Sequence, residues 1–133
     1  MVGAYAEHAR DFLFFWAVIT TVVFAIPLFF TPIAWARMMR FEIPAHTDLA
    51  VYFGRCLGAF ALVIEGMTFR AAFGGSGIQF VFEAGLAFSA LMVLVHVYGA
   101  VKGIQPITET LEIPFWVGAV LLFVLFFPVV STT

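Results

Sequence analysis

The sequence predicts an all-α integral membrane protein, a four-helix transmembrane bundle with a short interfacial helix after the first span. Of the 133 residues, 64% are hydrophobic and only 11% are charged, whereas soluble domains are about half apolar and about a quarter charged. Four apolar segments are each close to the roughly 20 residues that a helix needs to cross the hydrocarbon core. The length allows a single domain. The predicted spans are residues 12–30, 49–69, 78–101 and 113–130.

The first span contains no charged residue, and its only polar side chains are Thr20 and Thr21. Pro27 lacks an amide N–H, so we expect a kink there and a free carbonyl at Val23 that a neighbouring helix or hydroxyl satisfies. The following segment, 32–41, combines tryptophan, arginine and methionine side chains. This composition is typical of a short helix at the level of the lipid headgroups.

The second and third spans are joined by the sequence GGSG, which predicts a tight turn. Thr47 or Asp48 is expected to cap the second span. Gly54 and Gly58 on that span are four residues apart, a spacing that lets another helix approach closely. We therefore expect a homo-oligomer or a larger membrane complex built on this face, unless the glycines pack within the bundle.

An even number of spans places both termini and the GGSG turn on one side, called side A, and the other two connectors on side B. The third connector has the sequence IQPITETLEIP, with Pro106 and Pro114 as helix breakers. Three basic residues lie near side B and two near side A, which places the termini outside the cytoplasm by the positive-inside rule. These residues are Arg37, Arg40 and Lys102 near side B, and Arg10 and Arg70 near side A.

Charged side chains inside a span are costly, so they are expected to have partners or a function. Arg55 and His96 are predicted to lie at similar depth near side B, beneath the third connector. The third span has one small, polar face, formed by Ser89, His96, Gly99 and Gly103. His96 is therefore predicted to point inward, toward Arg55 or a glutamate. The binding candidates are Arg55, His96, Tyr98, Gln105, Glu109 and Glu112.

Near side A, Glu65, Glu83 and Arg70 are predicted to lie together, as a carboxylate pair answered by one arginine. His96, Glu65 and Glu83 are the candidate catalytic residues, because buried acids and bases are suited to proton transfer. The structural alternatives are an ion pair between Arg55 and a connector glutamate, a hydrogen-bonded core histidine at position 96, and an Arg70 that reaches the headgroups.

Several kinds of site are not expected. The sequence has no HExxH motif and no histidine pair at metal-binding spacing, so we expect no metal site and no cofactor. The single cysteine, Cys56, excludes an internal disulfide and thiol-pair redox chemistry. The net charge of −2 argues against a general attraction to nucleic acid.

Three segments together resemble the DoxX-like group of small four-helix bacterial membrane proteins. They are LFFTPIAWARMM at the end of the first span, YFGRCLGAFALVIEG in the second, and the pattern of His96, Tyr98 and Gly99 at the end of the third. The resemblance implies a four-helix bundle in the bacterial inner membrane, and some members of the group are associated with quinone-linked oxidoreductases. It implies no catalytic residue.

Two functions are compatible with these features. The favoured one is a membrane protein that binds a hydrophobic ligand, such as a lipid or quinone, or serves as an accessory subunit of a larger membrane complex. The alternative is a small membrane enzyme, an isomerase, cyclase or hydrolase, that uses buried Glu, His and Arg side chains on a lipophilic substrate. A transporter is less favoured, because the apolar stretch 57–64 separates the two charged layers.

Overall fold

The computed structural model describes residues 2–129, and over that range it is helical without any strand. This confirms the all-α class. Four helical stretches are long and apolar enough to cross a membrane, in agreement with the number of predicted spans. These stretches are Ala6–Phe30, Asp48–Gly74, Ile78–Lys102 and Ile107–Leu125.

The individual helices differ from the predicted spans at several ends: the first begins earlier, at Ala9, and the second continues past the predicted end at 69 to Gly74. The connector before the fourth span, expected to be interrupted by prolines, contains a short helix, and α7 ends before residue 126. The predicted helix over 126–129 is therefore wrong, and residue 130 lies outside the described range. The helices are α1 (Ala9–Thr20), α2 (Ile26–Phe30), α3 (Pro32–Met38), α4 (Asp48–Gly74), α5 (Ile78–Lys102), α6 (Ile107–Leu111) and α7 (Ile113–Leu125).

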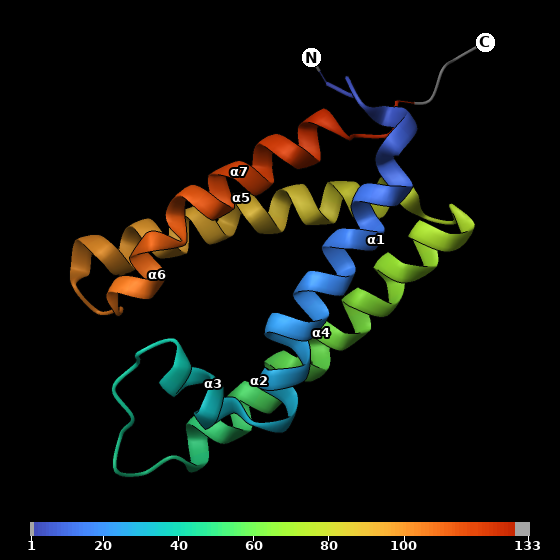
Figure 1. Cartoon of the computed structure of the whole chain (residues 1–133). Helices are drawn as coiled ribbons and strands as arrows, with labels where there is room; N and C mark the ends of the chain where they lie inside the picture. Colours follow the sequence, from blue (N-terminus) through green and yellow to red (C-terminus); the bar gives the residue numbers. More distant parts are fainter. Residues whose placement is uncertain (1, 130–133) are drawn as a thin grey trace.

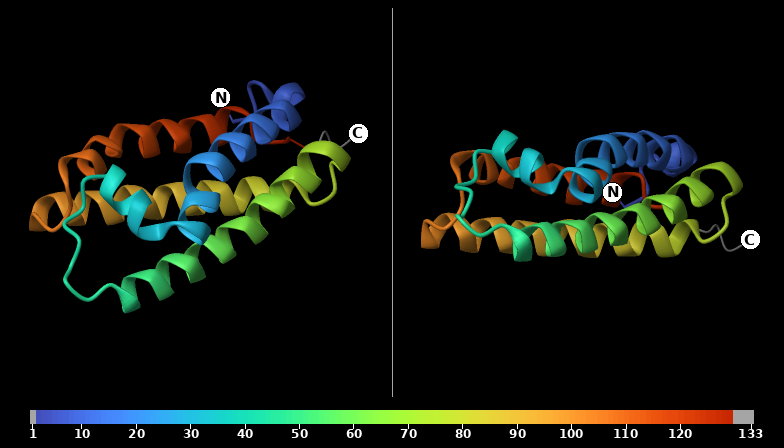
Figure 2. Two further views of the ribbon diagram at one scale, coloured as in Figure 1. Left: turned by 60° about the horizontal axis from the view of Figure 1, so that its bottom comes forward. Right: turned by 90° about the horizontal axis from the view of Figure 1, so that it is seen from below.

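The helices form two pairs that diverge from the side A end (Figure 1). In the first pair α1 and α2 pack along α4, and in the second pair α7 packs along α5. Seen from below, α1 and α7 lie in one layer and α4 and α5 in the other (Figure 2, right). The predicted bundle is thus an open arrangement of two helix pairs rather than four equally packed helices.

The core of the molecule lies at side A, where the two pairs meet. Leu13, Ala71, Phe82 and Phe123 are buried there, and the ring of Phe12 stacks on that of Phe126 at 4.9 Å. The backbone N–H groups of Gly3 and Tyr5 donate to the carbonyls of Val124 and Leu125, both at 2.9 Å. Arg10 donates to the carbonyls of Ala72 and Phe73 at the end of α4, groups that a helix terminus leaves without intrahelical partners.

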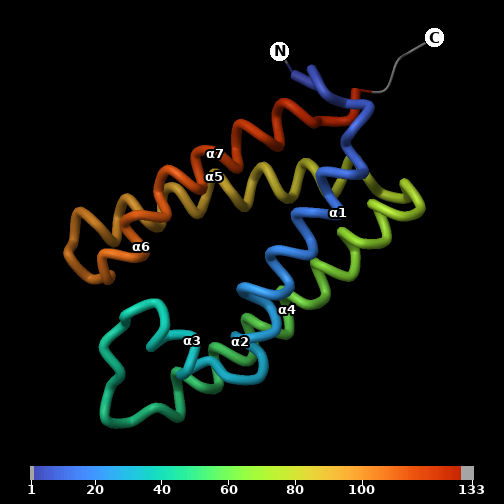
Figure 3. The backbone as a smooth tube through the Cα atoms, in the orientation of Figure 1, coloured from blue at the N-terminus to red at the C-terminus, as the bar shows by residue number. Residues whose placement is uncertain are grey.

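The first long helix is continuous to Phe30 except for a π-helical turn at Thr21–Ala25, just before Pro27. A single wide turn is a known way to accommodate a disturbed backbone ladder. The predicted kink therefore takes the form of a π-helical turn. The short α3 follows at the predicted place, and residues 39–47 then run as a wide loop to the start of α4 (Figure 3). Thr47 is the N-cap of α4, but its side chain makes no capping hydrogen bond.

Gly54 and Gly58 are used within the chain. A Cβ at Gly54 would lie 2.6 Å from the Cβ of Pro32, and a Cβ at Gly58 would overlap the backbone nitrogen of Phe29. Both glycines therefore allow α4 to pack against α2 and α3. The spacing allowed either contact with another chain or packing within the bundle. The structure shows packing within the bundle, so these glycines give no support to an oligomer.

Candidate functional site

The side chain of His96 is almost fully buried, with 2% of its surface exposed. Ser89 and Gly99 on the same face of α5 are also buried, as the small, polar face predicted, whereas Gly103 is exposed. The Nδ1 atom of His96 lies 2.7 Å from the carbonyl oxygen of Met92, one turn earlier. A carbonyl oxygen can only accept a hydrogen bond, so Nδ1 carries a hydrogen and donates it.

The third connector is held against the end of α5 by Gln105. Its amide nitrogen donates to the carbonyl of His96 and to the hydroxyl of Thr110, both at 3.0 Å. The side chain of Gln105 fits because position 99 is glycine: a Cβ there would overlap the Gln105 amide. This anchor sets where α6 begins and which way its side chains point.

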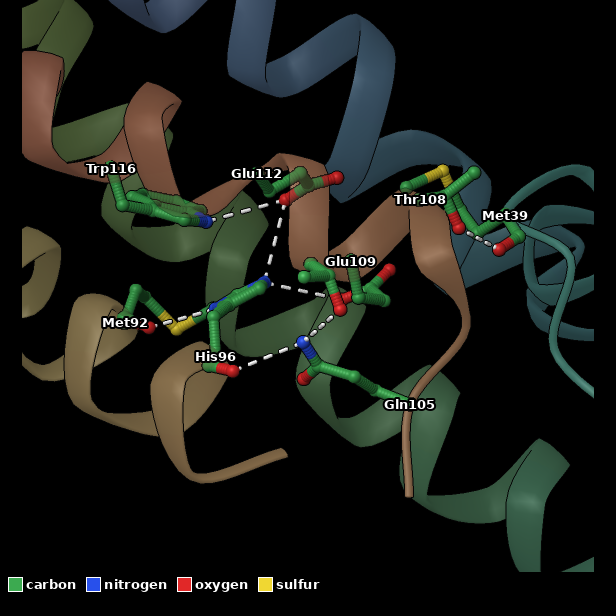
Figure 4. Close-up of polar contacts among 9 residues, drawn as sticks. Met39, Met92, His96, Gln105, Thr108, Glu109, Glu112 and Trp116 are labelled. Carbon is green, nitrogen blue, oxygen red and sulfur yellow. Dashed lines mark hydrogen bonds and ion pairs between the residues drawn. The ribbon is translucent and has the colours of Figure 1, made fainter. Parts of the chain in front are cut away.

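Helix α6 and the first residue after it bring two carboxylates to His96 (Figure 4). The Nε2 atom of His96 lies 3.2 Å from Oε2 of Glu109 and 3.6 Å from Oε2 of Glu112. The two glutamate side chains are 14% and 18% exposed. The indole N–H of Trp116 donates to the same Oε2 atom of Glu112 at 3.2 Å. The close approach of His96 to the connector glutamates was predicted, and Gln105 belongs to the same cluster.

The cluster of His96, Glu109 and Glu112 brings together three groups that accept hydrogen bonds and have none to donate to one another. When the histidine ring is neutral, its Nε2 atom carries only a lone pair, because the hydrogen is on Nδ1. That atom makes no hydrogen bond, and neither does Oε1 of Glu109. Among the ion pairs of the described residues, none joins a lysine or arginine to either glutamate. The cluster therefore needs a positive charge, supplied by protons or by a metal ion.

Arg55 does not join this cluster, contrary to the prediction. It is exposed on α4, and the two helix pairs have separated toward this end. The reason lies in the pairing of the helices: α4 packs along α1 and α2, whereas α5, which carries His96, packs along α7. Arg55 instead lines a groove on the surface. The residues of that groove are Phe29, Asp48, Val51, Tyr52, Arg55, Cys56 and Ala59.

The predicted side A cluster is also not formed. Glu65 accepts a hydrogen bond from the hydroxyl of Thr20 at 2.7 Å, within the first helix pair. Glu83 is exposed and accepts from Gln79 at 2.9 Å on its own helix, and Arg70 donates to Ser76 at 3.2 Å. The rotation of each helix about its axis, which decides these contacts, was not available from the sequence.

The prediction was wrong about two residues of the site, one that does not belong to it and one that it missed. Tyr98 is 59% exposed, because two residues along a helix from His96 is the opposite face. Trp116 was not a candidate, yet it contacts Glu112 through its N–H and lies beside the His96 ring at 6.1 Å between centroids. A signal for Trp116 exists in the sequence: it follows Glu112 by four residues, one helical turn.

Comparisons with protein families, with curated proteins and with solved structures find no match to this chain. Its function is therefore inferred from the geometry of its own residues.

Proposed function

We propose that this chain is an integral membrane protein that binds an amphiphilic ligand, a lipid or a quinone, in the groove beside Arg55. The observation that carries the proposal is the composition of that groove. The guanidinium group of Arg55 and the carboxylate of Asp48 line it together with apolar walls that include Phe29 and Val51. Arginine binds phosphate and carbonyl oxygens through several N–H groups at once, while the apolar walls suit an acyl or isoprenoid tail.

The membrane location is supported by the outer surface of the helices. In the most apolar window of α4 only 6% of the residues are buried, and large apolar side chains such as Phe53, Phe60 and Val63 are each at least 60% exposed. A soluble monomer rarely exposes so large an apolar surface. Surrounding lipid, or helices of a partner subunit, removes it from water.

The position of Arg55 along α4 fits a headgroup-proximal site. At about 1.5 Å per residue, α4 is about 40 Å long, roughly 10 Å longer than the hydrocarbon core. If α4 is centred in the bilayer, Arg55 lies about 5 Å inside the hydrocarbon boundary, within reach of the interface by the length of its side chain. A ligand headgroup held there leaves its tail alongside the groove walls.

The proposal is tested by native mass spectrometry of the full chain, released from nanodiscs that contain phosphatidylglycerol, ubiquinone and excess phosphatidylcholine. The comparison is between Arg55→Met and Arg70→Met, two exposed arginines at opposite ends of α4. We expect Arg55→Met to lower retention of the acidic lipid or the quinone at least about tenfold, and Arg70→Met to retain it. Ala59→Trp, which fills the groove without changing its charge, should also release the ligand. Equal retention by all three variants would refute the proposal.

The alternative, a membrane enzyme using His96 with Glu109 and Glu112, is favoured by the unpartnered Nε2 atom of His96. It requires a substrate-sized opening next to that atom. The hollow beside Arg55 and the one beside Arg10 are both lined by other residues. The amphiphile-binding function is therefore the better supported of the two.

A further inference from the structure

We propose that His96, Glu109 and Glu112 form a binding site for a divalent transition-metal ion, with Nε2 of the histidine and one oxygen of each carboxylate as ligands. The site is separate from the groove beside Arg55 and does not depend on the function proposed for it. One ligand atom from each of the three residues lies within 4.8 Å of the other two. These atoms come from α5 and from α6 with its C-cap residue Glu112.

The distances suit shared coordination. Ligands at about 2.1 Å from an ion, with angles of 90–120° between them, lie about 3.0–3.6 Å apart. The Nε2 atom of His96 is 3.2 Å from Oε2 of Glu109 and 3.6 Å from Oε2 of Glu112. Both values therefore place each carboxylate oxygen where it can bind the same ion as the histidine nitrogen.

The Nε2 atom of His96 is buried and has no hydrogen-bond partner under the geometry of the structure. It lies 3.2 Å from Oε2 of Glu109 and offers a lone pair, because the ring hydrogen is on Nδ1. A buried lone pair beside two carboxylates is favourable when a cation lies between them.

Charge balance is met by a divalent ion. Two ionised carboxylates carry two negative charges, which one divalent ion neutralises, whereas protons neutralise the cluster only when two of its groups each take one up. In a membrane an uncompensated charge is costly. The nearly complete burial of the histidine and partial burial of both carboxylates raise that cost further.

The surroundings of the ligands resemble those of known metal sites. A metal-binding histidine usually donates its other ring N–H to a carbonyl or carboxylate, and here Nδ1 donates to the carbonyl of Met92. The Glu112 oxygen that faces His96 is itself oriented by the indole N–H of Trp116. The donor set of one imidazole and two carboxylates suits Zn²⁺, Fe²⁺ or Mn²⁺, whereas Mg²⁺ prefers oxygen ligands alone.

The test uses the full chain in a mild detergent, treated with a chelator and then titrated with Zn²⁺ in equilibrium dialysis and with Co²⁺ by visible absorption. We expect one equivalent to bind, with a Co²⁺ spectrum of a site containing nitrogen and oxygen ligands, and Mg²⁺ at the same concentration not to compete. The melting temperature should rise with Zn²⁺ concentration, because only the folded chain presents the site.

Three variants and two controls locate the bound ion. Glu109→Gln, Glu112→Gln and His96→Gln should each lower the affinity for Zn²⁺ by more than about tenfold. Glu83→Gln removes an exposed carboxylate from the same helix as His96. His8→Gln removes the histidine of an exposed acidic cluster with Glu7 and Asp11. Both controls should bind Zn²⁺ as the unmodified chain does.

The outcomes that would overturn the proposal concern the unmodified chain as well as its variants. They are the lack of saturable binding at one equivalent, binding that survives both glutamate substitutions, and binding that is lost with His8→Gln. Because the first of these is measured on the unmodified protein, a variant that fails to fold does not prevent a decision.

Discussion

The indole N–H of Trp35 donates to the carbonyl oxygen of Val23 at 2.9 Å. This is the carbonyl that loses its intrahelical partner because residue 27 is proline. Trp35 lies on α3, which begins at Pro32 directly after the first long helix, so the short helix folds back to supply the missing donor. The carbonyl is thus satisfied as the sequence predicted, but by an indole of the following helix.

Substitution of Trp35 should be costly only while position 27 is proline. Trp35→Phe leaves the Val23 carbonyl without a donor, and we expect a loss of about 1–3 kcal/mol in the free energy of unfolding in mixed micelles. Pro27→Ala restores a backbone N–H, so the same Trp35 substitution should cost less in that background. A double-mutant cycle measures the difference, and strictly additive effects would show that the bond contributes nothing.

Gly58 and Gly66 on α4 form a matched pair for substitution by alanine. A Cβ at Gly58 would overlap the backbone of Phe29, whereas a Cβ at Gly66 would meet no atom within 4 Å. We expect Gly58→Ala to lower stability by about 1–3 kcal/mol through displacement of α2. Gly66→Ala should be neutral, or stabilising by up to about 1 kcal/mol, because alanine favours the helix. Equal melting temperatures for the two variants in one detergent would contradict this packing.

The hydroxyl of Thr20 and the carboxylate of Glu65 should behave as a coupled pair. Thr20→Val removes the donor 2.7 Å from Oε1 of Glu65, which we expect to cost about 1–3 kcal/mol. Adding Glu65→Met removes the polar group that was left without a partner, so the double variant should be more stable than Thr20→Val alone. Thr68→Val is the control, since that hydroxyl bonds only within its own helix, to the carbonyl of Ile64. A double variant less stable than Thr20→Val would disprove the pairing.

Trp116→Phe tests whether the indole N–H orients Glu112 for metal binding. The ring remains to pack against Phe88 and Phe24, but the hydrogen bond to Oε2 of Glu112 is lost. We expect Zn²⁺ affinity to fall by about 10- to 100-fold, the usual effect of removing such a supporting group. Trp16→Phe, which alters a tryptophan that makes no contact with Glu112 and packs on Phe123, should leave the affinity unchanged. Unchanged affinity in Trp116→Phe would show that Glu112 is held by other contacts.

The sequence was sufficient for those features that follow from periodicity. The α5 helix, predicted over 78–101, ends one residue later at Lys102, and its small, polar face placed His96 in the interior. The approach of Glu109 and Glu112 followed from depth alone, since the connector must cross the end of α5. These inferences needed only the rise of a helix and the cost of a buried charge.

The sequence did not determine which helices pair or how each is rotated. Arg55 and His96 were expected to meet, but α4 packs along α1 and α2, whereas α5 packs along α7. Likewise, the local spacing of histidines gave no sign of a metal site, because its ligands come from different elements. Rotation depends on close packing between specific side chains, which a single sequence does not display.

The pairing of α1 with α4 and of α5 with α7 has a consequence for synthesis at the ribosome. Each half of the chain contains the partners of its own polar group: Thr20 meets Glu65 in the first half, and His96 meets Glu109 and Glu112 in the second. The first half can therefore complete its polar contacts and insert while the second is still being translated. In the second half only 12 residues separate His96 from Glu109 in the sequence. Insertion in two successive hairpins thus limits the time that either group spends alone in lipid.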